Sequence, residues 1–335
     1  MPCFFSLSDI IDRIKNNSCK KKCTIIERKT ADVLKKLEYR NIPYKELWRS
    51  AIRCKLVYDH HSNINGLWRF IKTNQKPLQI DDAYVYELSH VSEPIHYDTR
   101  SYDALQKYNT TSFLWHTDNT IYITFHVEKH IEKKFLKKQD VFIKIRNNIS
   151  VNSFFYYEIL SLLKHIRCYI EKISETNPLC KYRIVIAGYS LGGIIVQIIA
   201  PVLAEIFKPK DFSICCHTFG SPKAGDSEFV KWFTKNVNEH YRIINGNDPI
   251  TMFPINHRWR HILNTTLQFD MDLHINIIKE DTSLYKNIWF KSRIINEIIK
   301  EYRDDHSFDL YITRLWKYAR IAQFIETSAK IIEVL

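Results

Sequence analysis

The sequence predicts an α/β fold, with a mainly parallel central sheet covered by helices on both faces. In the second half of the chain, apolar β-branched segments alternate with segments of helical periodicity, which is typical of strands joined by crossover helices. Six of the seven glycines lie between Gly188 and Gly246, so the positions that need a permissive backbone are concentrated there. One turn in this stretch joins an apolar strand directly to an apolar helix.

Composition favours a globular chain with anionic partners. Of 335 residues, 45% are hydrophobic and 26% are charged, a balance that supports a sizeable core. The net charge of +12 suits an anionic surface such as a membrane with acidic lipids. The basic residues are dispersed and match no recognised nucleic-acid motif, so nucleic acid is not expected as a partner. We expect a basic helical extension at residues 1–40 and one main domain at residues 41–335.

The chain is expected to be cytoplasmic, with reduced cysteines and no bound metal. Residues 1–14 hold no apolar run of the length that a signal peptide needs. The longest apolar stretch, residues 193–207, is interrupted by polar residues and a proline, and it is too short to span a bilayer. Eight cysteines in a chain of this length do not make a disulfide scaffold. Cys19 and Cys23 have no second pair at zinc-ligand spacing.

The first half of the chain contains two helices and a hairpin. Apolar residues at helical spacing predict a helix over residues 44–58 and a longer one over residues 152–173. Residues 112–115 and 120–125 are β-rich and flank a short polar turn, which predicts a hairpin. Residues 60–100 are punctuated by glycine and proline and are expected to be irregular.

The second half supplies the parallel strands. Residues 182–187 form an apolar, β-branched run of the kind that is buried in parallel sheets, and residues 192–207 follow as an apolar helix. Further strands are expected over residues 213–219, 241–244, 262–269 and 273–278, and further helices over residues 283–302 and 311–334.

The turn between that strand and that helix predicts a nucleophile. Gly188-Tyr189-Ser190-Leu191-Gly192 matches G-x-S-x-G, in which the serine stands on a tight strand-to-helix turn between two small residues. The N–H of Leu191, at the helix N-terminus, is placed to stabilise a developing oxyanion. The alternative is a chance match in a loop, and the strand before and the helix after argue against it.

A serine hydroxyl needs a base and an orienting acid to act as a nucleophile. In proteins with this strand-to-helix serine turn, both the acid and the histidine follow the serine along the chain. Asp248 stands just past the expected strand 241–244, at the carboxyl edge of the sheet. Asp226 is the rival, although its position before Glu228 favours a helix N-cap. For the base we favour His306, in a turn between two expected helices. The other downstream histidines are His257, His261 and His274.

Three segments resemble the fungal-type, or class 3, triacylglycerol lipases. They are AGYSLGG at residues 187–193, TFGSPKAGD at 218–226 and RIINGNDPITMFP at 242–254. The family's usual motifs are GHSLGG, TFGxPxxGD and R-x-x-N-x-x-D-P, in the same order. The resemblance is clearest over residues 110–260, and the segment that begins at His306 is similar to the family's terminal histidine segment.

This resemblance implies an α/β-hydrolase fold and hydrolysis of lipid esters without a cofactor. It implies a catalytic triad of Ser190, Asp248 and His306. Tyr189 stands where the family usually has a histidine that is not catalytic, so we expect this exchange to have little effect. The sequence leaves the head group, the acyl-chain length and the oligomeric state open.

The second oxyanion donor is the main departure from the family. Family members usually carry F-R-G-T or F-R-G-S after an early strand, and the matching stretch here is Phe125-His126-Val127-Glu128. A backbone N–H at Val127 or Glu128 could join that of Leu191, but a carboxylate beside a developing oxyanion repels it. Residues 128–150 take the place of the family's lid. Their apolar residues 141–143 suggest a flap that seeks an interface, and a solvated lysine-rich loop is the alternative.

Two functions remain. The leading hypothesis is a serine ester hydrolase that forms an acyl-enzyme at Ser190. The alternative is a catalytically impaired protein of lipase fold that binds lipid surfaces or a protein partner. The altered turn and the positive charge favour the alternative, and the complete set of Ser190, Asp248 and His306 favours the hydrolase.

Overall fold

The computed structural model describes residues 42–60, 95–98, 110–138, 141–146, 148–269, 275–278 and 303–320. Several predictions lie outside these residues. They are the basic extension at residues 1–40, the helix at 283–302, the Cys19–Cys23 pair and His274.

An eight-stranded sheet forms the centre of the described structure. Its strands stand in the order β1-β2-β3-β6-β7-β8-β9-β10. The five strands from β3 to β9 pair in parallel, while β1, β2 and β10 pair antiparallel at the two sides. The mainly parallel sheet is therefore confirmed. The strands are β1 Ile95–Asp98, β2 Thr110–His116, β3 Thr120–Val127, β6 Arg183–Tyr189, β7 Ser213–Phe219, β8 Glu239–Asn245, β9 Thr265–Phe269 and β10 Ile275–Ile278.

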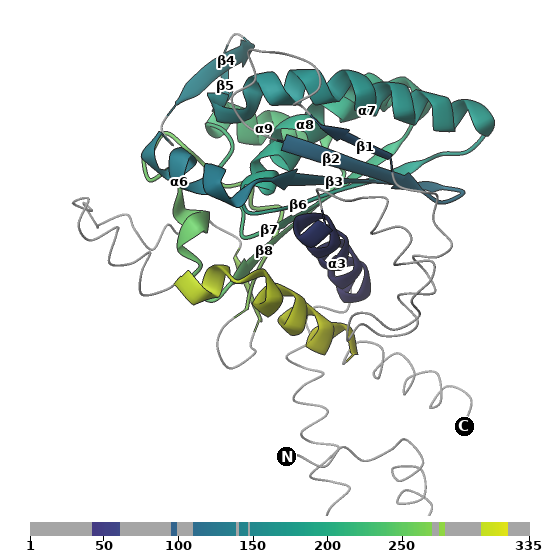
Figure 1. Ribbon diagram of the computed structural model, residues 1–335. Helices are drawn as coiled ribbons and strands as arrows, with labels where there is room; N and C mark the ends of the chain where they lie inside the picture. The colour runs from purple at the N-terminus through teal and green to yellow at the C-terminus, as the bar shows by residue number, and fades with distance from the viewer. Residues whose placement is uncertain are drawn as a thin grey trace, which may run out of the picture. The chain divides into compact units, whose positions relative to one another are not determined.

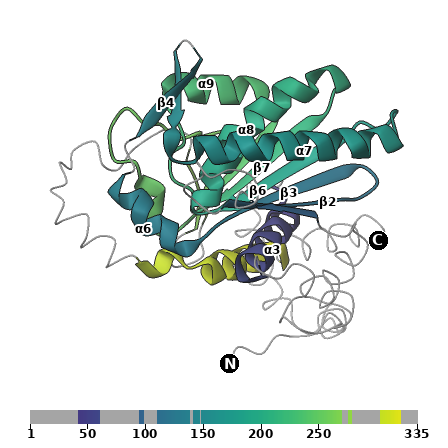
Figure 2. The ribbon, with the colours of Figure 1, turned by 45° about the horizontal axis from the view of Figure 1, so that its top comes forward.

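Helices cover both faces of this sheet. Figure 1 shows α7, α8 and α9 above the sheet, and α3 with the helical residues 308–320 below it. Figure 2 shows the same two layers from a tilted direction. This arrangement follows from the parallel strands, whose apolar residues point to both faces and need cover on both. The helices are α3 Tyr44–His60, α6 Lys129–Lys137, α7 Tyr156–Thr176, α8 Leu191–Phe207 and α9 Ser227–Asn236.

Helix α8 forms the centre of the core. Residues 191–210, which include α8, are long and apolar enough to cross a membrane, but 72% of their apolar window is buried inside the protein. A mostly buried apolar helix fits the core of a layered fold, where sheet and neighbouring helices cover all of its sides. Thirteen of its residues are buried, and it packs against β6 and β7.

Two segments differ from the sequence expectations. The described part of residues 128–150 forms regular structure, because α6 is followed by a separate hairpin of β4 Phe142–Arg146 and β5 Ile149–Asn152. Lys133, Lys134 and Lys137 of α6 are exposed, while Ile131 and Phe135 are buried. The lysine-rich run therefore contains a buried apolar stripe at helical spacing. Within the expected irregular stretch, residues 95–98 form β1, which becomes a strand by pairing with β2.

Several helices and strands begin a few residues away from the positions expected from the sequence. The first hairpin and the helix expected over residues 44–58 are confirmed as β2, β3 and α3. Strand β9 begins at Thr265, where pairing with Tyr241 of β8 begins, and not at residue 262. The last helix begins at residue 308, three residues earlier than expected.

Candidate active site

Ser190 occupies a strained turn between β6 and α8. Its backbone has φ 53° and ψ −123°, a left-handed conformation that side chains rarely adopt. The turn is held by a hydrogen bond from the Ser190 N–H to the carbonyl of Phe219 at 2.9 Å, and by another from the Gly193 N–H to the Ser190 carbonyl at 3.0 Å. The strain directs the hydroxyl away from the sheet, as a nucleophile elbow requires.

The two glycines of the motif permit close backbone approach. A Cβ on Gly188 would lie 2.5 Å from the carbonyl of Gly192, and a Cβ on Gly192 would lie 2.8 Å from the carbonyl oxygen of Phe125. The end of β3, the end of β6 and the start of α8 therefore meet with no room for side chains. The tight turn predicted between two small residues is therefore confirmed.

The structure brings Ser190, His306 and Asp248 together in a hydrogen-bonded series. The Nε2 of His306 lies 2.9 Å from the Oγ of Ser190, and its Nδ1 lies 2.8 Å from the Oδ2 of Asp248. The side chain of Asp248 is fully buried and that of His306 is 11% exposed. These distances fit a base that can accept a proton from the serine while the carboxylate fixes its tautomer.

Both oxygens of Asp248 are held in place. Oδ1 accepts a hydrogen bond from the N–H of Ile250 at 2.9 Å, and Oδ2 accepts one from the hydroxyl of Tyr311 at 2.5 Å. The rival Asp226 caps α9, where its side chain accepts from the N–H of Phe229 at 2.9 Å. The helix N-cap predicted for Asp226 is therefore confirmed.

His306 stands at the end of a short 3-10 turn, η5 Arg303–His306. The carbonyl of Asp305 accepts a hydrogen bond from the side chain of Asn245 at 2.7 Å, and the carboxylate of Asp305 accepts one from the N–H of Asn247 at 2.8 Å. These contacts fix the turn to the loop that carries the acid. Of the alternative histidines, His257 is exposed, and the Nε2 of His261 lies 3.3 Å from Arg242.

The two predicted oxyanion turns meet at one pocket beside Ser190. Val127, the last residue of β3, and Glu128 line it together with Leu191, the first residue of α8. The first N–H groups of a helix have no partner within the helix, which suits Leu191 to donate to an oxyanion. The cavity has a volume of about 20 Å³, room for about one water molecule.

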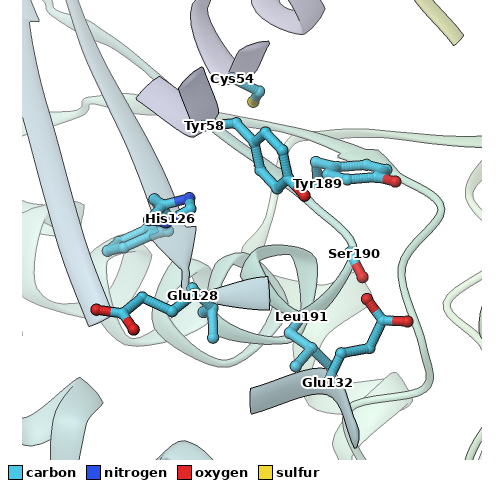
Figure 3. A pocket seen from close by; sticks show the side chains of 10 residues that line it. Cys54, Tyr58, His126, Glu128, Glu132, Tyr189, Ser190 and Leu191 are labelled. Carbon is cyan, nitrogen blue, oxygen red and sulfur yellow. The ribbon is translucent and has the colours of Figure 1, made fainter. Parts of the chain in front are cut away.

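The carboxylate that faces Ser190 is that of Glu132 (Figure 3). In Figure 3 the side chain of Glu128 points away from Ser190, whereas that of Glu132 points toward the serine hydroxyl. The carboxylate placed to repel an oxyanion at Ser190 is therefore that of Glu132, and not that of Glu128 as expected from the sequence. Glu128 is the N-cap of α6 and Glu132 lies in its first turn, and the sequence analysis did not single out Glu132.

A second polar cluster lies at the opposite end of β6. Glu46, Cys215 and His217 have ligand atoms within 4.8 Å of one another. The guanidinium of Arg183 donates to Glu46 at 2.5 Å and to Glu239 at 3.1 Å, so a positive charge already stands between the carboxylates. Burial lowers the pKa of His217 well below its usual value and keeps the ring neutral. We interpret this cluster as a charge network that joins α3 to the sheet.

Comparison with known proteins bears on the identity of this site. Residues 119–257 match the family described as Lipase (class 3). All three motifs fall within the match, and the predicted resemblance is confirmed. His306 lies beyond it, so its assignment depends on the geometry described above. A secreted mono- and diacylglycerol lipase of Fusarium solani is 31% identical over 90 residues, which are 27% of this chain and 25% of that protein. The aligned part thus spans about a quarter of that relative.

Solved structures confirm the α/β-hydrolase fold. A lipase from Rhizopus microsporus var. chinensis superposes with a TM-score of 0.53 at 16% identity, covering 69% of this chain and 76% of that one. A mutant form of MDLA from Penicillium cyclopium also gives 0.53, at 15% identity, covering 73% of this chain and 90% of that one. At these identities the similarity concerns the fold.

Proposed function

We propose that this protein is a serine ester hydrolase that cleaves acyl esters of lipids through an acyl-enzyme. One observation carries the proposal: His306 lies within hydrogen-bond distance of both Ser190 and Asp248, at a strained turn that presents the serine. The class 3 lipase match over residues 119–257 supports lipid esters as the substrate class.

The geometry supports the following steps. The Oγ of Ser190 attacks the acyl carbonyl carbon while its proton passes to Nε2 of His306, and Asp248 stabilises the imidazolium. The tetrahedral intermediate then collapses, the ester C–O bond breaks, and the leaving alkoxide takes the proton from His306. In the second half, His306 removes a proton from water, which attacks the carbonyl carbon of the acyl-enzyme. His306 then returns this proton to the Oγ of Ser190 as the bond from Oγ to the acyl carbon breaks and the carboxylic acid leaves.

The oxyanion of each tetrahedral intermediate needs preorganised donors. We assign the N–H of Leu191 as one donor and a backbone N–H at Val127 or Glu128 as the second, since these turns border the same pocket. Glu132 of α6 lines the same pocket.

An anionic lipid surface is the partner that suits α6. Its outer side presents an exposed basic patch of Lys133, Lys134, Lys137 and Lys138. The neighbouring Phe142 is 45% exposed, while Val141 and Ile143 are half-buried, so the expected apolar flap presents one aromatic side chain. Vesicles containing phosphatidylserine should bind the protein more tightly than neutral vesicles, and replacing the four lysines with glutamine should remove the difference.

Hydrolysis of nitrophenyl esters of short and long acyl chains tests the proposal. We expect turnover by the wild-type protein, enhanced on long chains by added lipid, and its loss in Ser190→Ala. Mono- and diacylglycerols are the natural esters to test next, given the name of the Fusarium relative. A folded protein without Ser190-dependent turnover on any chain length would favour the alternative, a lipase-fold protein that binds lipid or protein without chemistry.

A further inference from the structure

We propose that Tyr189 is a positioning residue that holds His306 in place beside Ser190. This inference rests on the proposed function. The sequence comparison with the family gives no such role, because the residue before the serine is a histidine there and is not catalytic. In this chain, however, the side chain of Tyr189 bridges the strand that carries Ser190 and the turn that carries His306.

Tyr189 contacts His306 through both its hydroxyl and its ring. The hydroxyl donates a hydrogen bond to the backbone carbonyl of His306. The ring stacks on the imidazole with centroids 5.0 Å apart and an interplanar angle of 22°. Its stack with Phe308 is closer, at 4.0 Å and 3°. Two residues of the histidine segment therefore pack on one tyrosine.

The surroundings of Tyr189 make it a stable donor. Burial and the nearby carboxylate of Asp248 raise the pKa of its phenol, so it keeps its proton at neutral pH. Tyr58 of α3 packs edge-on against the ring, with centroids 5.8 Å apart. Figure 3 shows both tyrosine rings beside Ser190.

Because Tyr189 is next to Ser190 in the chain, its contact with His306 ties the histidine to the strand that leads to the serine. Tyr189 is the last residue of β6 and directly precedes Ser190, so the strand fixes it as firmly as the nucleophile. The side chain of Asn245 holds the carbonyl of Asp305, and Tyr189 holds the next carbonyl, that of His306. The hydrogen bond from Asn245 comes from the end of β8, which precedes Asp248, and the one from Tyr189 comes from the end of β6, which precedes Ser190. Together they fix the imidazole between its two partners.

A pair of tyrosine-to-phenylalanine variants separates positioning from packing. Tyr189→Phe keeps the stacked ring and removes the hydrogen bond to His306. Tyr182→Phe is the matched control, because the buried Tyr182 also donates to a backbone carbonyl, that of Ile173 at 3.3 Å, remote from the site. We expect Tyr189→Phe to lower kcat about 10-fold, with KM changed less than about twofold, because a small misplacement of a catalytic group slows chemistry more than binding. Tyr182→Phe should leave kcat unchanged.

A graded variant and a second readout complete the test. Tyr189→Leu, which also loses the stack, should lower kcat about 100-fold. The low-field proton NMR signal of the His306 Nδ1–H, bonded to Asp248, should broaden in Tyr189→Phe and stay sharp in Tyr182→Phe. Unchanged kcat and an unchanged signal in Tyr189→Phe, with an active wild type, would overturn this inference and leave the proposed function intact. If the wild type shows no turnover, the proposed function fails and the NMR signal alone decides the positioning role.

Discussion

The hydroxyl of Tyr311 donates to the same oxygen of Asp248 that faces His306, at 2.5 Å and 2.8 Å respectively. The same hydroxyl accepts a hydrogen bond from the N–H of Asn245 at 3.1 Å. Tyr311 is fully buried. The carboxylate is therefore oriented by the helix that follows the histidine as well as by its own loop, so the assembly of the site and the folding of this helix are coupled.

Removing that hydroxyl should destabilise the protein. In Tyr311→Phe the buried Asn245 N–H loses its acceptor and Asp248 loses a donor, which should lower the free energy of unfolding by about 1–3 kcal/mol. Urea denaturation at pH 7 measures this, with Tyr182→Phe as the control for loss of a buried tyrosine hydroxyl. Equal losses of unfolding free energy in the two variants would show that the hydrogen bonds of Tyr311 contribute no more to stability than that of any buried tyrosine.

The two candidate acids should give opposite results. Asp248→Ala should lower kcat on the order of 10⁴-fold, because His306 loses the group that fixes its tautomer and stabilises its charge. Asp226→Ala should leave kcat nearly unchanged and lower the free energy of unfolding by about 1–2 kcal/mol, because α9 loses its N-cap. Ester hydrolysis and urea denaturation of both variants provide the comparison. Turnover that depends on Asp226 and survives Asp248→Ala would contradict the assignment.

The carboxylate of Glu132 should slow the reaction. Its side chain points toward Ser190 (Figure 3), beside which the proposed mechanism develops an oxyanion, so Glu132→Gln should raise kcat/KM about 5- to 10-fold, equivalent to about 1 kcal/mol of repulsion. Glu128→Gln is the matched control, since that side chain points away from the serine (Figure 3). A gain in Glu128→Gln and none in Glu132→Gln would show that the original assignment of the repulsion to Glu128 was right.

The protein should lose stability in acid through buried histidines. Burial lowers the pKa of His240 from 6.5 to about 3. Above pH 6.5 neither the folded nor the unfolded chain binds a proton there, so His240 has no effect on stability. Between pH 6.5 and 3 only the unfolded chain binds it, and the free energy of unfolding falls by about 1.4 kcal/mol per pH unit.

A substitution at His240 isolates this contribution. Between pH 7 and pH 5 the wild-type protein should lose about 2 kcal/mol more than His240→Gln does, because glutamine takes up no proton. Urea denaturation at the two pH values gives the difference. Parallel losses in both proteins would mean that His240 is protonated in the folded state.

Local patterns were sufficient for the elbow and for the positions of the parallel strands along the chain. The G-x-S-x-G turn, the strand before it and the helix after it are short-range features, and the strain at Ser190 follows from them. The N-cap at Asp226 was predicted in the same way, from a carboxylate just before a helix. His306 lies 116 residues from Ser190, and the motif order of the family predicted it before the geometry placed it beside the serine.

Contacts between segments that are distant in the sequence could not be predicted from local patterns. The role of Glu132 depends on how α6 packs over the pocket, and the lysines around it obscured the buried stripe of Ile131 and Phe135. The contact of Tyr189 with His306 joins residues 117 positions apart, so no local signal announces it. The family's pattern marked Tyr189 only as a departure. Such residues are recognised once the strands and the histidine turn have positions in space.

Covalent labelling of Ser190 tests the central claim most directly. A 4-nitrophenyl alkylphosphonate reacts with an activated serine and releases nitrophenol, and mass spectrometry of peptides locates the adduct. The account predicts one phosphonyl group per chain, on Ser190, formed on the order of 10³-fold more slowly in His306→Ala. Labelling elsewhere, or labelling of Ser190 at the same rate in His306→Ala, would contradict activation of Ser190 by His306.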